Sequence, residues 1–315
     1  MTQRQHIRDH GGGLDAAIAT YGGQRDRWLD LSTGINPMAY PIGDISPNAW
    51  TALPDQAAFS RLEAAARAFW TVPEGAAVLA APGASSLIAR VPTLQSVGRV
   101  VISGPTYNEH AAAFRAQGWH VDEAGLGDAR VIVHPNNPDG HFWRDPSYDQ
   151  ALSVIDESFC DVEPAASLIA AATRPGVIVL KSFGKFWGLA GVRLGFAVGD
   201  PLLIDKLREA IGPWQVSGPA LEIGARALSD QSWATSTRQR LGRDAARLDA
   251  LVTAKGAKLV GGTTLFRLYD VGDAVAWQDR FARGQVWSRI FPYSDRWLRL
   301  GLPASDRWDQ VEAAL

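Results

Sequence analysis

The sequence predicts an α/β protein with a mostly parallel sheet, joined to a smaller α+β domain. One observation is a series of short, apolar, β-branched runs, at Arg99–Ser103, Arg130–His134, Ser153–Phe159, Val177–Ser182 and Val192–Gly199. Another is that helical patterns lie between several of these runs, at Asn108–Gln117 and Asp145–Ala151. Short apolar strands that alternate with helices are typical of a parallel sheet covered on both faces.

The two ends of the chain have a different pattern. Residues 1–40 are glycine-rich and read as an arm with one short helix at Leu14–Tyr21, and a helix at Gln56–Trp70 follows within a large domain of residues 41–215. Beyond Pro213 a long helical stretch precedes separated strands. Its elements are a helix from Pro219 to about Lys255, strands at Thr263–Tyr269, Gln285–Phe291 and Trp297–Leu302, and a helix at Ala274–Arg283. We therefore assign residues 216–315 to a smaller α+β domain, which we expect the arm to complete.

Composition excludes several classes of function. The 315 residues are 46% hydrophobic and carry a net charge of −2, so neither nucleic acid nor an anionic membrane is expected as a partner. No stretch approaches the roughly 20 apolar residues that span a bilayer, and the first residues lack the apolar core of a signal peptide. The single cysteine, Cys160, reads as a small buried hydrophobe and agrees with a reducing compartment. These features predict a cytoplasmic protein.

The strongest chemical signal is Lys185, which follows a buried strand in an aromatic segment, residues 181–196. Partial desolvation lowers the pKa of a lysine ammonium and favours imine formation. Ser182 stands three residues before Lys185 and Arg193 eight residues after it, and both side chains are suited to binding a phosphate. A lone lysine after a strand would be a surface residue, but this spacing argues against that interpretation.

This segment resembles the lysine motif of the aspartate-aminotransferase-like superfamily, the pyridoxal phosphate (PLP) fold type I enzymes. The resemblance implies that Lys185 carries PLP as a Schiff base, and that Ser182 and Arg193 hold the cofactor phosphate. It also implies a mixed, mostly parallel seven-stranded sheet in the large domain, and a homodimer with its active sites at the subunit interface.

Other family motifs follow in the same order along the chain. Asp156 ends an apolar strand, where a carboxylate is costly to bury unless it meets a cation. By resemblance it pairs with the pyridine nitrogen, and Asn137, in a loop that alone reads as a turn, bonds the phenolic oxygen. Tyr107 would stack on the pyridine ring. We interpret His134 as structural.

A glycine turn and a strand arginine complete this part of the resemblance. The turn Gly83-Ala84-Ser85 begins a helix, and its backbone N–H groups suit a phosphate, although a plain serine N-cap is the rival interpretation. Arg299 lies centrally in a strand and matches the family arginine that forks onto the substrate α-carboxylate. A structural salt bridge remains the alternative for Arg299.

Two N-terminal segments narrow the family to a branch. The stretch His10-Gly11-Gly12 and the later segment containing Gly34 and Asn36 resemble the threonine-phosphate decarboxylases of cobalamin biosynthesis, relatives of histidinol-phosphate aminotransferase. By this resemblance the first stretch binds the substrate phosphate, and Gly34 and Asn36 lie beside its carboxylate. Phe159 and Leu53 stand where many aminotransferases have tyrosines, which weakens an aminotransferase interpretation.

The resemblance therefore implies PLP-dependent decarboxylation of O-phospho-L-threonine to 1-amino-2-propanol phosphate, with Lys185 and Asp156 as catalytic residues and no metal. One alternative is a histidinol-phosphate-type aminotransferase. Another is a non-catalytic partner with the same fold in aminopropanol attachment. A PLP-binding regulator is disfavoured, because the leader of roughly 40 residues is glycine-rich rather than a basic DNA-binding segment.

Overall fold

The computed structural model describes residues 9–315, and the chain divides into two compact units. The large unit is Met38–Arg240, and the small unit combines the segment up to Pro37 with Leu241–Leu315. This division falls within helix α8 (Gln231–Thr253), whereas the sequence placed a domain limit at residue 215. The difference arises because helix α7 (Gly218–Ser229) packs against helix α3 (Gln56–Trp70). The limits 41–215 and 216–315 remain our proposal for the folding domains.

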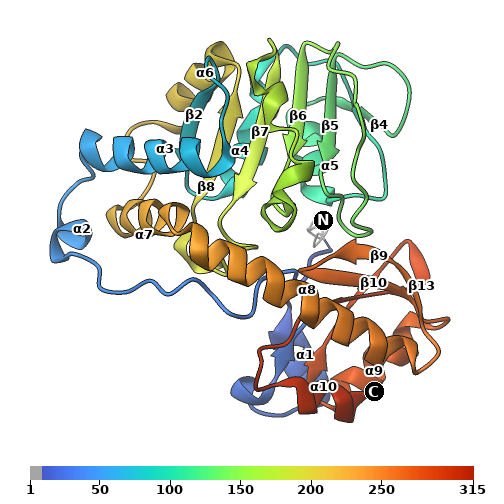
Figure 1. The fold of residues 1–315 in the computed structure, drawn as a ribbon. Helices are drawn as coiled ribbons and strands as arrows, with labels where there is room; N and C mark the ends of the chain where they lie inside the picture. Colours follow the sequence, from blue (N-terminus) through green and yellow to red (C-terminus); the bar gives the residue numbers. More distant parts are fainter. Residues whose placement is uncertain (1–8) are drawn as a thin grey trace, which may run out of the picture. The chain divides into compact units, whose positions relative to one another are not determined.

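The large unit is built on a seven-stranded mixed sheet (Figure 1). From edge to edge its strands are β2 (Ala77–Ala81), β8 (Gly195–Gly199), β7 (Val177–Ser182), β6 (Leu152–Asp156), β5 (Ala129–Val133), β3 (Arg99–Ile102) and β4 (His120–Asp122). Strand β8 pairs antiparallel with both β2 and β7, and the other pairings are parallel. The predicted fold class, a mostly parallel mixed sheet, is confirmed.

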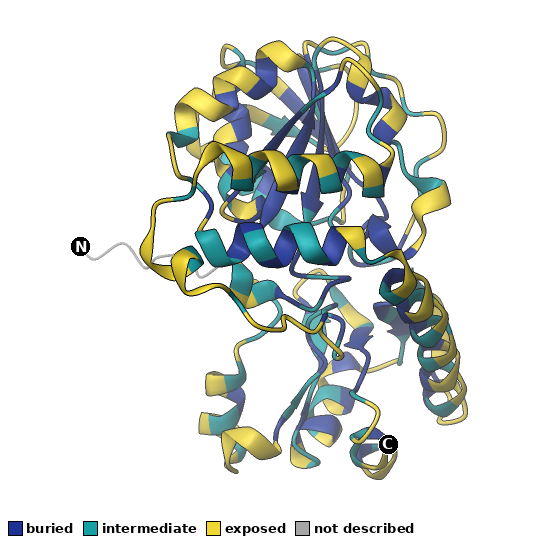
Figure 2. Cartoon of the chain, turned by 60° about the vertical axis from the view of Figure 1, so that its left-hand side comes forward, coloured by how far each residue is buried: buried dark blue, intermediate teal, exposed yellow. Residues whose placement is uncertain are grey.

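Helices cover this sheet and expose their outer faces, while the strands between them are buried (Figure 2). They include α3, α4 (Ala84–Arg90), α5 (Asn108–Ala116) and α6 (Pro201–Ile211), while α7 packs on α3 and α2 (Pro47–Thr51) packs on α7. Helix α3 shows how the sequence specifies such an element. Asp55 caps its first turn by accepting a hydrogen bond from Ala58 N at 2.7 Å, and its buried positions are Leu62, Ala66 and Trp70.

The small unit holds a four-stranded antiparallel sheet in the order β12 (Arg289–Phe291), β13 (Ser294–Gly301), β10 (Phe266–Asp270) and β9 (Lys258–Thr263). Its helices include α1 (Leu14–Tyr21), α9 (Ala274–Arg283) and α10 (Trp308–Ala314). The N-terminal segment is bonded into this unit, because β1 (Leu29–Asp30) pairs parallel with β11 (Val286–Trp287). Beyond β1, Gly301 N donates to Leu31 O at 2.7 Å.

Three local predictions differ from the structure. The helix predicted at Asp145–Ala151 does not form, since Asp145 takes a left-handed φ of 45° and Pro146 lacks an amide donor. The stretch predicted as one helix from Pro219 divides at Asp230, whose carboxylate instead accepts from Trp233 N at 2.9 Å and starts α8. Strands β2, β4 and β9 were not predicted, because they are alanine-rich, short or glycine-containing.

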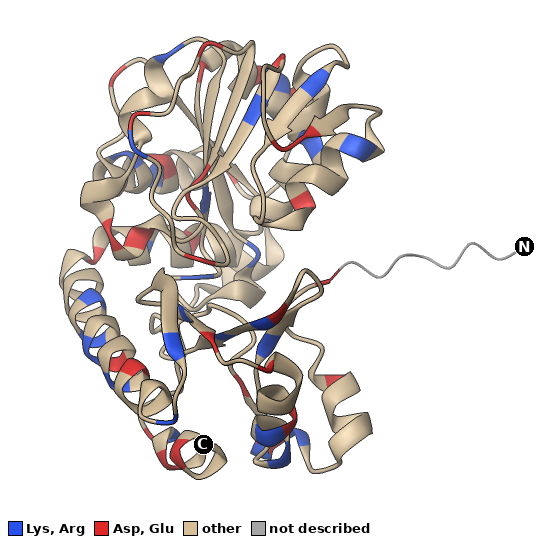
Figure 3. Cartoon of the chain, turned by 90° about the vertical axis from the view of Figure 1, so that its right-hand side faces the viewer, with Lys and Arg blue, Asp and Glu red and all other residues tan. Residues whose placement is uncertain are grey.

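A membrane span and a one-sided charge distribution would each place requirements on the described residues. Among residues 9–315, no helix combines the length and apolar character that crossing a bilayer requires. Acidic and basic residues are interspersed on the face of the chain drawn in Figure 3. This distribution agrees with the small net charge of −2.

Candidate active site

A single cavity in the large unit brings together every residue that the sequence assigned to cofactor binding. Its lining includes Gly83, Ala84, Ser85, Tyr107, Asn137, Asp156, Ser182, Lys185 and Arg193. Most of these residues follow or end strands β2, β3, β5, β6 and β7, which run in the same direction. The carboxyl ends of parallel strands form one edge of a sheet, so residues distant in sequence converge there.

Asp156 is the buried anion of this cavity, with 2% of its surface exposed. Its Oδ2 lies 2.7 Å from His110 Nε2, and its Oδ1 accepts a hydrogen bond from Ser158 N at 2.9 Å. Burial alone would raise the pKa of Asp156, but the hydrogen bonds from His110 and Ser158 outweigh it and lower the pKa below its ordinary value. The cavity therefore presents an ionised carboxylate, which suits a cationic ring nitrogen.

His110 was not singled out from the sequence. It lies on α5, one helical turn after Tyr107, and is 1% exposed. The available signal was this spacing of three residues, which places both side chains on one side of the helix. Without knowing that α5 faces the end of β6, that spacing has no chemical meaning.

The opposite end of the cavity is suited to an anion. Gly83 has a φ of 85°, and a Cβ there would lie 2.5 Å from Arg193 Nη2, so only glycine lets the backbone approach that guanidinium. A Cβ at Gly195 would lie 2.4 Å from Ala84 N, so the start of β8 also packs closely on this turn. The Ser182 hydroxyl accepts from Gly184 N at 3.3 Å, and its own hydrogen can be donated to a ligand.

Lys185 reaches the cavity from the loop after β7. Its Nζ lies 5.3 Å from the centroid of the Phe159 ring, which is 5% exposed and lines the same cavity. The flanking side chains Phe183, Phe186 and Trp187 are fully buried. Phe159 thus lies beside Lys185 but has no hydroxyl, whereas Leu53 is 67% exposed.

The residues predicted to bind substrate, His10, Gly11, Gly12, Gly34, Asn36 and Arg299, belong to the small unit. Ser32 joins two of these elements. Its Oγ accepts from Gly12 N at 2.6 Å, and its carbonyl accepts from Arg299 Nη2 at 2.7 Å. Gly11 packs so closely that a Cβ would lie 2.5 Å from Ser32 O. Gly34 and Asn36 are buried a few residues further along.

Arg289 is a second cation beside Arg299 that the sequence analysis missed. The two arginines are cross-strand partners on β12 and β13. Arg289 forms an ion pair with Asp9 at 2.6 Å and also bonds the His10 carbonyl. Arg299 is 5% exposed, and burial together with the charge of Arg289 lowers its pKa to about 10. An anion bound here would stabilise the charged form of the Arg299 guanidinium and so counteract the lowering of its pKa.

Comparison with known proteins agrees with this geometry. Residues 129–314 match the family described as Aminotransferase class I and II. A threonine-phosphate decarboxylase from Sinorhizobium sp is 38% identical over 93% of this chain and 92% of its own length. One from Pseudomonas aeruginosa is 37% identical over 98% and 97%.

Among solved structures, histidinol-phosphate aminotransferase from Sinorhizobium meliloti, in complex with pyridoxal-5'-phosphate, superposes with a TM-score of 0.80. It is 16% identical and covers 100% of this chain and 97% of its own. At this identity the likeness concerns the fold alone.

Fold, cavity and sequence together place the chain in the aminotransferase class I and II family of PLP fold type I enzymes. Within that family it belongs with the threonine-phosphate decarboxylases. PLP is the cofactor of the family, and the donors of the cavity fit it. The cavity lining combines a lysine, a glycine turn suited to an anion, and a buried, ionised carboxylate.

Proposed function

We propose that this chain decarboxylates O-phospho-L-threonine to 1-amino-2-propanol phosphate, with PLP bound in the large unit. The relatives support it by their names and by identities of 37–38% over nearly the whole chain. The observation that carries the substrate assignment is the pair Arg289 and Arg299, next to the glycine stretch that begins at His10. Two guanidinium groups, of which Arg289 would exchange its Asp9 partner for the ligand, match a substrate with two anionic groups, a carboxylate and a phosphomonoester.

The cofactor would be held at both ends of the cavity. The Gly83–Ser85 turn, Ser182 and Arg193 would bind its phosphate, since their donors converge at one end. At the other end Asp156 would accept a hydrogen bond from the protonated pyridine nitrogen, and His110 keeps that carboxylate ionised. Asn137 would bond the phenolic oxygen and Tyr107 would cover the ring.

When bound, PLP supplies an electron sink for the negative charge that develops at the substrate Cα. In decarboxylation the Cα–carboxylate bond breaks, carbon dioxide leaves, and Cα then needs one proton. Lys185 is the group of the cavity suited to deliver that proton from its Nζ. Phe159 packs beside Lys185 and adds no proton of its own.

Substrate orientation would come from the small unit. Arg299 would fork onto the α-carboxylate, while Arg289, His10 and the N–H group of Gly11 would bind the phosphate. Gly12, whose N–H donates to Ser32 Oγ, would hold this stretch in place. Histidinol phosphate has a phosphate but no carboxylate, so it would leave one of the two arginines without a ligand anion. This difference favours a phosphorylated amino acid over the substrate of the rival aminotransferase.

The reaction type is tested by supplying PLP and O-phospho-L-threonine to the purified protein. We expect carbon dioxide and aminopropanol phosphate in equal amounts, with no requirement for a keto-acid acceptor. Release of a keto acid, or turnover of histidinol phosphate only with 2-oxoglutarate present, would establish the aminotransferase instead. A chain inactive alone but active with a second protein would point to the partner role.

We further propose a cytoplasmic homodimer. Large apolar side chains of the large unit are solvent-exposed, with Trp50 at 69%, Leu53 at 67% and Trp214 at 55%. A second copy that covers them would remove an unfavourable apolar surface from water. Light scattering coupled to gel filtration should give twice the chain mass of 34.0 kDa, and Trp50→Ser with Trp214→Ser should shift it toward the monomer.

A further inference from the structure

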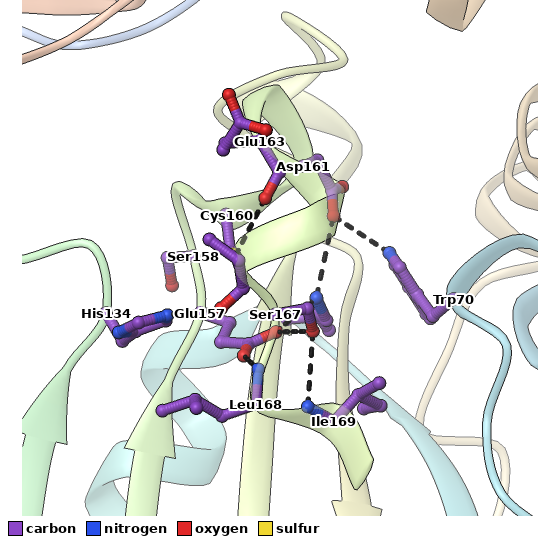
Figure 4. Close-up of polar contacts among 12 residues, drawn as sticks. Trp70, His134, Glu157, Ser158, Cys160, Asp161, Glu163, Ser167, Leu168 and Ile169 are labelled. Atoms are coloured by element: carbon purple, nitrogen blue, oxygen red, sulfur yellow. Dashed lines mark hydrogen bonds and ion pairs between the residues drawn. The ribbon is translucent and has the colours of Figure 1, made fainter. Parts of the chain in front are cut away.

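A buried network of charged side chains adjoins residues of the proposed cofactor cavity in sequence but does not line that cavity. Its members are Glu157, Asp161 and Lys181, each at most 4% exposed, and we call them the ion network. Figure 4 shows polar contacts of its two acidic members, Glu157 and Asp161. Glu157 directly follows Asp156, and Lys181 directly precedes Ser182. Neighbouring residues of an extended strand point to opposite sides, so the cavity takes Asp156 and Ser182 while the network takes their neighbours.

Each of the three side chains of the ion network has an ion-pair or hydrogen-bond partner. Lys181 Nζ lies 2.5 Å from Glu157 Oε2 and 3.7 Å from Asp161 Oδ1. The remaining acceptors of Glu157 are used by Ser167 Oγ at 2.7 Å and Leu168 N at 2.5 Å. Burial alone would lower the pKa of Lys181, but the two carboxylates outweigh it, so the ammonium stays charged. Buried ions held this completely fix the backbone that carries them.

A metal site does not explain this cluster. His134, Glu157 and Cys160 offer ligand atoms within 4.8 Å of one another. However, His134 Nε2 lies 2.7 Å from Ala166 O, and its Nδ1 accepts from Trp143 N at 3.1 Å, so both ring nitrogens are in use. Burial lowers the pKa of His134, which keeps the ring neutral. Both oxygens of Glu157 are likewise engaged, as described above.

Two connections run from the ion network to the cavity. The pair Lys181–Glu157 bonds the end of β7 to the end of β6, and Glu157 N also donates to Leu180 O at 2.9 Å. This fixes the spacing between Ser182 and Asp156, which contribute to opposite ends of the proposed cofactor site. The cross-strand pair thus acts on two cavity residues without touching the cavity.

The second connection reaches Lys185. Asp161 Oδ2 accepts a hydrogen bond from Trp187 Nε1 at 3.2 Å, and Trp187 lies two residues after Lys185. The Trp187 ring stacks on Phe183 at 5.1 Å and on Trp233 at 5.3 Å between centroids. The loop that carries Lys185 is therefore held by the Trp187 ring. This ring stacks on Phe183 and Trp233, and its N–H is bonded to Asp161 of the ion network.

We propose that the ion network positions the cofactor-binding groups, setting where Lys185 and Asp156 stand relative to each other. Glu157, Asp161 and Lys181 are positioning residues, since they act through their neighbours. The inference rests on the proposed function only in assuming that Lys185 binds PLP. It predicts that cutting a connection between the network and the cavity changes cofactor binding even where the fold is intact.

Two tryptophans allow a matched test. Trp187 and Trp70 each donate an indole N–H to the Asp161 carboxylate, at 3.2 Å and 2.8 Å, and both are buried. Trp187 belongs to the lysine loop, whereas Trp70 ends helix α3. Trp187→Phe and Trp70→Phe therefore remove equivalent hydrogen bonds from the same carboxylate, and only one of them is in the loop of Lys185.

The full chain is titrated with PLP, and the absorbance band of the Lys185-bound cofactor is followed against PLP concentration and against pH. For Trp187→Phe we expect a dissociation constant about tenfold higher, the lower end of the cost of losing a hydrogen bond to a charged group, and a shifted pH midpoint of the band. Trp70→Phe should leave both within twofold of the wild type while lowering the melting temperature similarly. Equal changes in the two variants, or none in either, would overturn the proposal.

A second variant keeps the proposal testable if Trp187→Phe does not fold. In Lys181→Met with Glu157→Met the buried ion pair is replaced by apolar side chains, an exchange that is often neutral or stabilising. We expect the melting temperature to be retained while the PLP dissociation constant and the pH midpoint both move. Unchanged cofactor binding in this folded variant would refute the positioning role. If the wild-type chain itself forms no Lys185-bound cofactor, the proposed function fails instead.

Discussion

Asp156 in the large unit and Arg299 in the small unit are both buried charges, at 2% and 5% exposure, but their surroundings act in opposite directions. His110 and Ser158 stabilise the charged form of Asp156 and lower its pKa. Burial and the neighbouring Arg289 destabilise the charged form of Arg299 and lower its pKa to about 10. The protein thus keeps the carboxylate proposed to bind the cofactor ionised before any ligand arrives, whereas the charged form of the proposed substrate cation would be stabilised further by an incoming anion.

The largest effect that this comparison predicts comes from neither charge but from Lys185, the lysine proposed to bind the cofactor. Lys185→Ala should abolish the absorbance band of the covalently bound cofactor, together with its sensitivity to borohydride, and should reduce turnover by several orders of magnitude. Lys206→Ala, at a lysine on helix α6, serves as the control and should behave as the wild type. A band that survives in Lys185→Ala would disprove the central assignment.

Arg299 should produce the next largest effect. Arg299→Gln removes the forked donor for the α-carboxylate, and we expect kcat/KM for O-phospho-L-threonine to fall by about 10²-fold. Affinity for PLP and its absorbance band should remain unchanged, because the cofactor cavity is lined by large-unit residues. A parallel loss of cofactor binding would mean that Arg299 is a structural residue, as the sequence left open.

The contrast between the two units also explains what the sequence could reveal. The large-unit site was predictable because most of its residues end or follow an apolar strand, and parallel strands end at one edge. Lys185, Asp156 and Ser182 needed only that rule and a family motif. His110 was missed because its role depends on which face of α5 meets β6, and no local pattern encodes that packing.

In the small unit, prediction from sequence was weaker for a physical reason. Arg289 and Arg299 become partners only through the antiparallel register of β12 and β13, which the sequence presented as one strand at Gln285–Phe291 and another at Trp297–Leu302. Similarly, the break at Asp230 depends on a side chain that caps α8 rather than continuing the helix. Register and capping are decided by geometry that periodicity alone does not contain.

The pH response of Asp156 provides a test of intermediate size. Its folded pKa lies below the ordinary value of 3.8, so its contribution to stability is complete above 3.8 and is lost as the pH falls further. We therefore expect no carboxylate titration in PLP binding between about pH 5 and 8. His110→Phe removes the main opposing hydrogen bond, so burial should raise the pKa of Asp156 and PLP affinity should weaken already in the acidic part of that range.

PLP dissociation constants measured across this pH range decide the matter, with His110→Gln as the comparison because its amide can still donate to Asp156. The glutamine variant should stay closer to the wild type. Superimposable pH profiles for the phenylalanine variant and the wild type would show that Ser158 N alone keeps the carboxylate ionised.

The smallest expected effect belongs to Ser32, which organises the small unit without contributing a charge. Its hydroxyl accepts from Gly12 N and donates to Asp30 Oδ1 at 2.6 Å, and its carbonyl accepts from Arg299. Ser32→Ala removes only the hydroxyl bonds, worth about 1 kcal/mol net, which corresponds to a rise in KM of about fivefold. Because the carbonyl remains, Arg299 should keep its position and kcat should be little changed.

Ser32→Thr retains a hydroxyl and should recover part of the loss. If instead kcat fell and KM did not, Ser32 would act on the reacting groups rather than on the loop that receives the substrate phosphate, and the division of roles between the two units would need revision.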